Sequence, residues 1–209
     1  MQQPLVVYRY FDEAKYADAM TQGSLRISTL ERCRAYENEH QGDALEGTQT
    51  YLSGSIVGGS DDAAFVEIAR RSGIEIGADC SNISVVNCAS YISMPDAYIL
   101  STAIERNDEL FLECFGQFCV EIVSPALFFR HISSVLSSRR LIDYGSYGPV
   151  IYRNRNYTGL EKIPPMAFVK PAVPYAQQRE FRFAWNPVGT CEPADIVAPK
   201  IRELCRRVA

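Results

Sequence analysis

Short stretches in which apolar and polar residues alternate are spread along the whole chain. The clearest lies at 5–11, where Leu5, Val7, Arg9 and Phe11 fall on one side of a predicted β-strand. The segment 174–183, "PYAQQREFRF", is predicted to be another strand, with aromatic residues on one face. Further strands are predicted from their apolar or β-branched residues at 24–28, 48–57, 82–92, 117–123, 148–157 and 164–173.

Capping residues and apolar spacing predict helices between these strands. One is expected from Asp12 to about Gly23, and a second from Ser28, which has capping-box spacing to Glu31. The others are expected at 61–73, from Asn107, at 125–138 with a proline in the first position, and at 199–208. Helices gather in the first two thirds and strands in the last third, which predicts an α+β fold of mixed, mostly antiparallel sheets with flanking helices in a single domain, residues 1–209.

Composition narrows the classes of protein to consider. The net charge of −4 offers no general attraction to nucleic acid or to an anionic membrane. No apolar run reaches the roughly 18 residues that span a bilayer, and the first strand begins too early for a signal peptide. Seven cysteines without metal-binding spacing, and only two histidines, predict a cytoplasmic protein with no metal.

The polar residues of the 174–183 strand raise the question of a site. A period of two places Gln178, Glu180 and Arg182 on one face, with Phe181 and Phe183 on the other. A carboxylate in this position can stabilise the positive charge that develops on a sugar ring when a glycosidic bond opens. The alternative is a solvated strand face with an internal ion pair, which contributes little to stability.

Three other features have both a functional and an ordinary structural interpretation. Arg9, on a largely apolar strand face, can bind a phosphate or carboxylate, or extend its guanidinium into solvent. Ser101 and Thr102 can line a site or cap the end of a segment. Asp43 and Glu46, in the loop "GDALEG", can face a substrate or belong to a solvated acidic turn.

The order of these residues resembles the arginine–serine–glutamate class of ADP-ribosyltransferases. That layout has an arginine on the first strand, a Ser-Thr-Ser strand near the middle and a Gln-x-Glu on a late strand, and the resemblance implies the split sheet of that class. The resemblance implies that Arg9 contacts the phosphates of NAD, that Ser101 and Thr102 shape the nicotinamide pocket, and that Glu180, assisted by Gln178, stabilises the oxocarbenium ion. The chain departs from the pattern at Ala103, which stands in place of the second serine.

A second resemblance covers nearly the full length. "VVYRYF", "GSLRIS", "GDALEG", "NCASY", "CVEI" and "REFR" occur in the order found in a bacterial family of uncharacterised domains, the DUF2971 type. Here the loop lacks that family's proline. This resemblance implies a stand-alone bacterial or phage-borne domain and names no reaction.

Together these patterns lead to one main hypothesis and two alternatives. The first is an NAD-using ADP-ribosyltransferase or NAD glycohydrolase, acting as a toxin or defence effector on a protein or nucleic-acid acceptor, with a tyrosine such as Tyr8, Tyr98 or Tyr175 stacking on a ring of NAD. The second is a site that binds a nucleotide-like molecule without chemistry, through Arg9, Arg182 and the basic segment 153–155. The third is a protein-interaction module, such as an immunity or anti-defence protein, suited to its many aromatic residues.

Overall fold

The computed structural model describes residues 6–36 and 42–208 and has the predicted α+β architecture. Its main sheet has eight strands with antiparallel pairings, in the order β14-β2-β7-β1-β8-β15, with β13 paired to β7 and β9 paired to β13. These strands are β1 (Val6–Phe11), β2 (Ser24–Thr29), β7 (Tyr98–Ala103), β8 (Phe118–Val123), β9 (Ile142–Pro149), β13 (Glu180–Pro187), β14 (Ala194–Val197) and β15 (Cys205–Val208).

The sheet divides along one edge of β7. One side of β7 pairs with β13 over its whole length, from Tyr98 opposite Trp185 to Ala103 opposite Glu180. On the other side, pairing with β2 ends at Ile99 and pairing with β1 begins at Ala103. β1 and β2 therefore separate beside the middle of β7, so this edge is left open for side chains instead of a neighbouring strand.

Helices cover both faces of this sheet. The main core lies on one face, where aromatic side chains of β13 meet α5 (Pro125–Ser138) and α1 (Ala14–Thr21). Trp185 is fully buried there and its indole nitrogen donates to Ser133 Oγ at 2.8 Å. A smaller core on the other face includes Leu30, Ile99 and Phe168, from α2 (Leu30–Ala35), β7 and the 3₁₀ turn η1 (Met166–Phe168).

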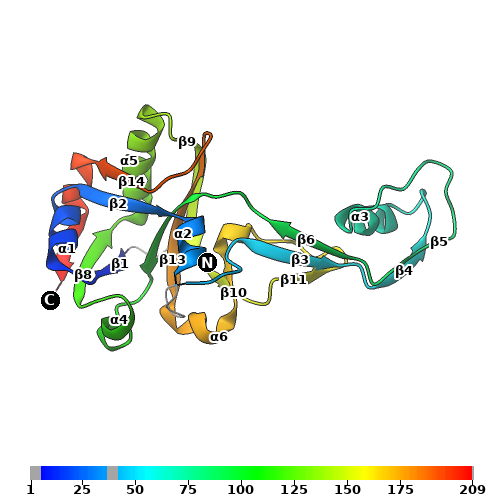
Figure 1. Cartoon of the computed structure of the whole chain (residues 1–209), viewed down its shortest axis with the longest axis horizontal. Coiled ribbons are helices and arrows are strands. Elements are labelled where there is room, and N and C mark those ends of the chain that lie inside the picture. Colours follow the sequence, from blue (N-terminus) through cyan, green and yellow to red (C-terminus); the bar gives the residue numbers. More distant parts are fainter. Residues whose placement is uncertain (1–5, 37–41, 209) are drawn as a thin grey trace.

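An arm extends from this body (Figure 1). Its base is a three-stranded sheet of β3 (Thr48–Leu52), β6 (Ala89–Ser93) and β11 (Asn156–Thr158). Its tip is the pair β4 (Ser55–Gly58) and β5 (Ile83–Val86), packed against α3 (Ala63–Arg71) around Phe65, Ala69 and Val85. The predicted continuous strands 48–57 and 82–92 are each broken in two, because Gly54 and Asn87 have positive φ angles of 64° and 50°.

The remaining elements are short. They are α4 (Asp108–Cys114), β10 (Ile151–Tyr152), β12 (Val169–Lys170), α6 (Ala172–Tyr175), and the 3₁₀ turns η2 (Ala176–Gln178) and η3 (Pro199–Glu203). No helix of the described ranges is long and apolar enough to cross a membrane.

Several predicted boundaries were wrong for identifiable reasons. The segment before Glu180 is helical, and the strand begins only after Arg179, which has a φ of 43°. The predicted terminal helix is a 3₁₀ turn followed by β15, because pairing with β8 completes the sheet. The second helix is capped by Thr29 instead of Ser28, and the N-cap position of the first is Glu13 instead of Asp12, without a capping hydrogen bond from its side chain.

Replacing Gly145 by alanine is expected to destabilise the main core by about 1–3 kcal/mol, because the core has no space for the added methyl group. A Cβ at this position of β9 would lie 2.3 Å from Cδ1 of Trp185 and 2.9 Å from the carbonyl oxygen of Ala184. Gly148, in the same strand, is the matched control, since an added Cβ there meets nothing within 4 Å. Urea unfolding of both variants measures the difference, and equal stability of the two would contradict this description of the core.

Candidate functional site

A cavity of about 530 Å³ opens where β1 and β2 separate. Its walls come from β1, β7, α4, the end of α2 and the segment that leads into β13. A volume of this size is typical of small-molecule sites. Of the predicted site residues, those that line the cavity are Tyr8, Arg9, Ser101, Thr102, Gln178 and Glu180. The tertiary structure therefore brings together residues that are up to 172 positions apart in the chain (Glu180 minus Tyr8).

Arg9 lies at the divided edge of β7. Its Nη1 donates to the carbonyl oxygen of Ser101 at 2.6 Å, within the gap between the two strand pairings. Burial lowers the pKa of Arg9 to about 10, so the guanidinium remains charged at neutral pH. No carboxylate among the described residues forms an ion pair with Arg9, and this leaves its charge available to an anionic ligand.

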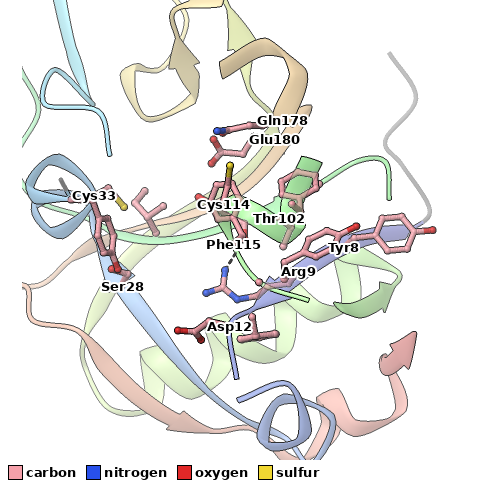
Figure 2. A pocket seen from close by; sticks show the side chains of 18 of the residues that line it. Tyr8, Arg9, Asp12, Ser28, Cys33, Thr102, Cys114, Phe115, Gln178 and Glu180 are labelled. Atoms are coloured by element: carbon pink, nitrogen blue, oxygen red, sulfur yellow. Dashed lines mark hydrogen bonds between the residues drawn. The ribbon is translucent and has the colours of Figure 1, made fainter. Parts of the chain in front are cut away.

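Glu180 and Gln178 lie together across the cavity from Arg9 (Figure 2). Both side chains are buried, although Gln178 belongs to η2 and not to the strand. The left-handed residue Arg179 turns the chain between them, so they reach the same wall without the predicted strand alternation. The sequence-based grouping of these two residues was correct, but the local geometry assumed for it was wrong.

Glu180 is held by cations on both carboxylate oxygens. Oε1 accepts from Nε of Arg182 at 2.7 Å, and Oε2 lies 2.9 Å from Nζ of Lys170. Burial by itself would raise the pKa of Glu180, but Arg182 and Lys170, with a hydrogen bond from Ser101, outweigh it and lower the pKa to about 2. The carboxylate is therefore ionised at neutral pH despite being only 4% exposed.

Arg182 connects Glu180 to a second buried carboxylate behind the cavity wall. Its Nη1 donates to Oε1 of Glu46 at 2.7 Å and to the carbonyl oxygen of Ala167 at 2.6 Å. Oε2 of Glu46 lies 3.7 Å from Nζ of Lys170. Glu46, Lys170, Glu180 and Arg182 thus form a buried group of two anions and two cations, here called the four-charge cluster. Only Lys170 and Glu180 of this cluster line the cavity.

The loop "GDALEG" is neither a solvated turn nor a wall of the cavity. Glu46 joins the four-charge cluster, and Asp43 forms a buried ion pair with Arg155. Tyr175 donates its hydroxyl to the carbonyl oxygen of Gly42 at 2.7 Å, which fixes the start of the loop. The loop therefore supports the site from behind. Arg155, and Arg153 with its ion pair to Glu161, are committed elsewhere, so the predicted basic contribution of 153–155 to the cavity was wrong.

Two further candidate residues, Tyr98 and Thr102, lie on β7 and differ in whether they reach the cavity. Tyr98 is three residues from Ser101 and so faces the opposite side of β7, where it is buried in the main core, and its predicted role in ring stacking was wrong. Thr102 does line the cavity, and its hydroxyl donates to the carbonyl oxygen of Phe181 at 2.7 Å. Thr102 therefore shapes the wall while its hydroxyl is already bonded.

Two parts of the site were not predicted from the sequence. Lys170 is a single lysine between Val169 and Pro171 in an apolar run, and a charge in such a position is itself a signal of pairing. The second part is an aromatic wall formed by Tyr10, Phe111 and Phe115, in which the rings of Tyr10 and Phe111 stack with centroids 4.5 Å apart. Nothing local in the sequence indicates that α4 lies beside β1.

The cavity thus combines an aromatic wall, a guanidinium with no ion pair to any described carboxylate, and an ionised carboxylate. Burial raises the pKa of the Cys33 thiol, which also lines the cavity, to about 11, so this cysteine is not a nucleophilic thiolate at neutral pH. Among the residues described, no three or more histidine, cysteine or acidic side chains gather in a way that could hold a metal ion. Comparisons of the chain with models of protein families, with curated proteins and with solved structures find no match.

Proposed function

We propose that this protein cleaves NAD, as an ADP-ribosyltransferase or an NAD glycohydrolase. The observation that carries the proposal is the meeting of Arg9, Ser101 and Glu180 in one cavity at the divided edge of β7. The resemblance to the arginine–serine–glutamate class concerned only their order along the chain. Their convergence is a property of the folded chain, because β7 pairs with β1 on one side and with β13 on the other, and both Tyr8 and Glu180 lie opposite Ala103.

Each part of the cavity suits one part of the dinucleotide. Arg9 presents a planar fork of donors, which fits the oxygens of a pyrophosphate. The aromatic wall offers rings on which a flat heterocycle can stack. Glu180 holds a fixed negative charge where the ribose would lie between these two groups.

In the proposed reaction the bond between C1′ of the ribose and N1 of nicotinamide breaks. Its electron pair passes to the nicotinamide nitrogen and removes the positive charge of the pyridinium ring. The ribose becomes an oxocarbenium ion, which the carboxylate of Glu180 stabilises. Water or a nucleophile of an acceptor then adds at C1′ and loses a proton. The amide of Gln178, beside Glu180, is placed to orient the sugar or the incoming group.

The cytoplasm is the proposed site of action. All seven cysteines are free thiols, which fits a reducing compartment. In the transferase reaction the acceptor is a protein or a nucleic acid. A role as a toxin or a defence effector follows from the same resemblance.

Binding without chemistry is the second candidate function. The observation that favours it is the pairing of both oxygens of Glu180 with cations, which reduces the net negative charge presented to a ligand. In that case binding of a nucleotide would raise the melting temperature of the protein by mass action, and the nucleotide would be released without being cleaved.

Incubation of the protein with NAD, followed by chromatography for free nicotinamide, distinguishes the two functions. Nicotinamide release supports the proposed reaction. Binding of NAD by calorimetry without release would support the second function, and the absence of binding by folded protein would exclude both.

Replacing Arg9 by alanine is expected to weaken NAD binding about 10- to 100-fold, because a hydrogen bond to a charged group contributes about 1.5–3 kcal/mol. Arg26→Ala is the matched control, since Arg26 lies exposed on β2 in an ion pair with Asp195 and outside the cavity. Isothermal calorimetry measures both affinities, with melting temperature as the check on folding. Equal affinities would show that Arg9 does not contact the ligand.

A further inference from the structure

Lys170 lies at the end of β12 with only 4% of its surface exposed. Its Nζ is 2.9 Å from Oε2 of Glu180, 3.7 Å from Oε2 of Glu46 and 4.9 Å from the ring centre of Tyr175. Burial would lower the pKa of Lys170, but Glu180 and Glu46 outweigh it and raise the pKa, so the ammonium is charged. The charge is therefore fixed by the carboxylates around it and not by water.

The two cations beside Glu180 differ in what else they hold. Arg182 also binds Glu46 and the carbonyl oxygen of Ala167, and it does not line the cavity. Lys170 lines the cavity and has Glu180 as its nearest carboxylate. Arg182 thus anchors the cluster within the protein, and Lys170 contacts Glu180 on the cavity side.

Each oxygen of Glu180 has a cation within 2.9 Å: Oε1 accepts a hydrogen bond from Arg182, and Oε2 forms an ion pair with Lys170. Rotation of the carboxylate about the Cγ–Cδ bond would move Oε1 to the ammonium of Lys170 and Oε2 to the guanidinium of Arg182. These two partners differ in shape, since one is a planar fork of donors and the other a single ammonium group. With Lys170 removed, Arg182 would be the one cation still in contact with the carboxylate, and Ser101 would remain as a neutral hydrogen-bond partner, so the carboxylate could turn toward Arg182. The field that keeps the carboxylate ionised would also be weaker.

We propose that Lys170 is a positioning residue that aims the Glu180 carboxylate at the reacting sugar and keeps it ionised. This inference rests on the proposed NAD cleavage for its catalytic consequence. The contact between Lys170 and Glu180 can be tested without turnover. Lys170 acts through Glu180 and is not assigned a bond to the reacting atoms.

Four proteins test the proposal: wild type, Lys170→Met, Lys170→Arg and the double variant Lys170→Met/Glu46→Gln. The double variant removes one cation and one anion, so the cluster is again balanced and its folding is protected. The first measurement is a carbon NMR titration of the Glu180 side-chain carboxyl in ligand-free protein. The second is nicotinamide release from NAD as a function of pH.

In Lys170→Met and in the double variant, the carboxyl of Glu180 is expected to titrate about 1–3 pH units higher than in wild type. The value of kcat is expected to fall about 10²-fold with KM little changed. A misaligned Glu180 carboxylate stabilises the transition state less well but hardly affects substrate binding. Lys170→Arg keeps the charge and is expected to retain the low titration midpoint of wild type.

Two results would overturn the assignment. One is an unchanged titration midpoint of Glu180 in folded Lys170→Met or in the double variant. The other is recovery of kcat in the double variant, which would reduce Lys170 to a balancing charge. If wild type releases no nicotinamide, the proposed function fails, while the NMR titration still decides whether Lys170 controls Glu180.

Discussion

Replacing Glu180 by glutamine is expected to reduce nicotinamide release from NAD by about 10²- to 10³-fold, the usual effect of removing one preorganised electrostatic group. The amide keeps the size of the side chain and its place on the cavity wall. It loses the negative charge that faces the oxocarbenium ion. The loss should therefore appear in kcat, with NAD affinity changed much less.

Glu46→Gln is the matched control for this experiment. Glu46 carries the same charge, belongs to the same four-charge cluster and contacts the same Arg182 and Lys170. Its side chain is also buried, but it does not line the cavity. Both substitutions leave the cluster with one excess cation, so both should lower the melting temperature.

The comparison separates folding from chemistry. Retained turnover in Glu46→Gln together with lost turnover in Glu180→Gln supports a catalytic carboxylate. An equal loss in the two variants would mean that the cluster serves only the fold. Full activity of Glu180→Gln would refute the proposed role of this residue directly.

Replacing Arg182 by methionine is expected to lower the free energy of unfolding by roughly 3–5 kcal/mol. The guanidinium is 1% exposed and binds Glu180, Glu46 and the carbonyl oxygen of Ala167. Without it, two buried carboxylates share Lys170 as their remaining cation in the cluster. Urea unfolding followed by tryptophan fluorescence measures the loss, since Trp185 is in the same strand.

Arg179→Met is the control for the loss of an arginine in this segment. Arg179 pairs with Glu105 at 2.9 Å, but both side chains are more than half exposed. Such a pair contributes about 0–1 kcal/mol. Adding Glu46→Gln to Arg182→Met should recover part of the stability, because one of the two uncompensated carboxylates is then neutral. A similar loss for Arg179→Met and Arg182→Met would contradict the burial of the cluster.

Alternation and capping were sufficient to predict the elements whose stabilising interactions are local. The strand at β1, the helix with proline in its first position and the helix capped by Asn107 are confirmed. Failures occurred where a tertiary partner outweighed local preference. The segment 205–208 has apolar spacing that fits a helix, yet it pairs as a strand with β8 because that edge of the sheet is available.

In the candidate site, too, local alternation predicted some features, and contacts with distant segments decided the others. A period of two correctly separated Glu180 and Arg182 from Phe181 and Phe183, because side-chain direction in a strand depends only on position along it. The same rule places Tyr98 and Thr102 on one face of β7, yet Tyr98 lies in the main core and Thr102 lines the cavity, so alternation by itself did not decide which of the two reaches the site. Whether the polar face meets water or a second layer of protein depends on distant segments, and here Glu46 and Lys170 bury it.

The opening stretch of β13 shows both what the sequence determined and what the tertiary structure decided. Its residue types and their alternation already placed a carboxylate and a guanidinium side by side on one face. The folded chain added the cavity, the guanidinium of Arg9 on its opposite side and the lysine that contacts Glu180. Those features arise from contacts between residues far apart in sequence, and such contacts leave no periodic trace in the segments that make them.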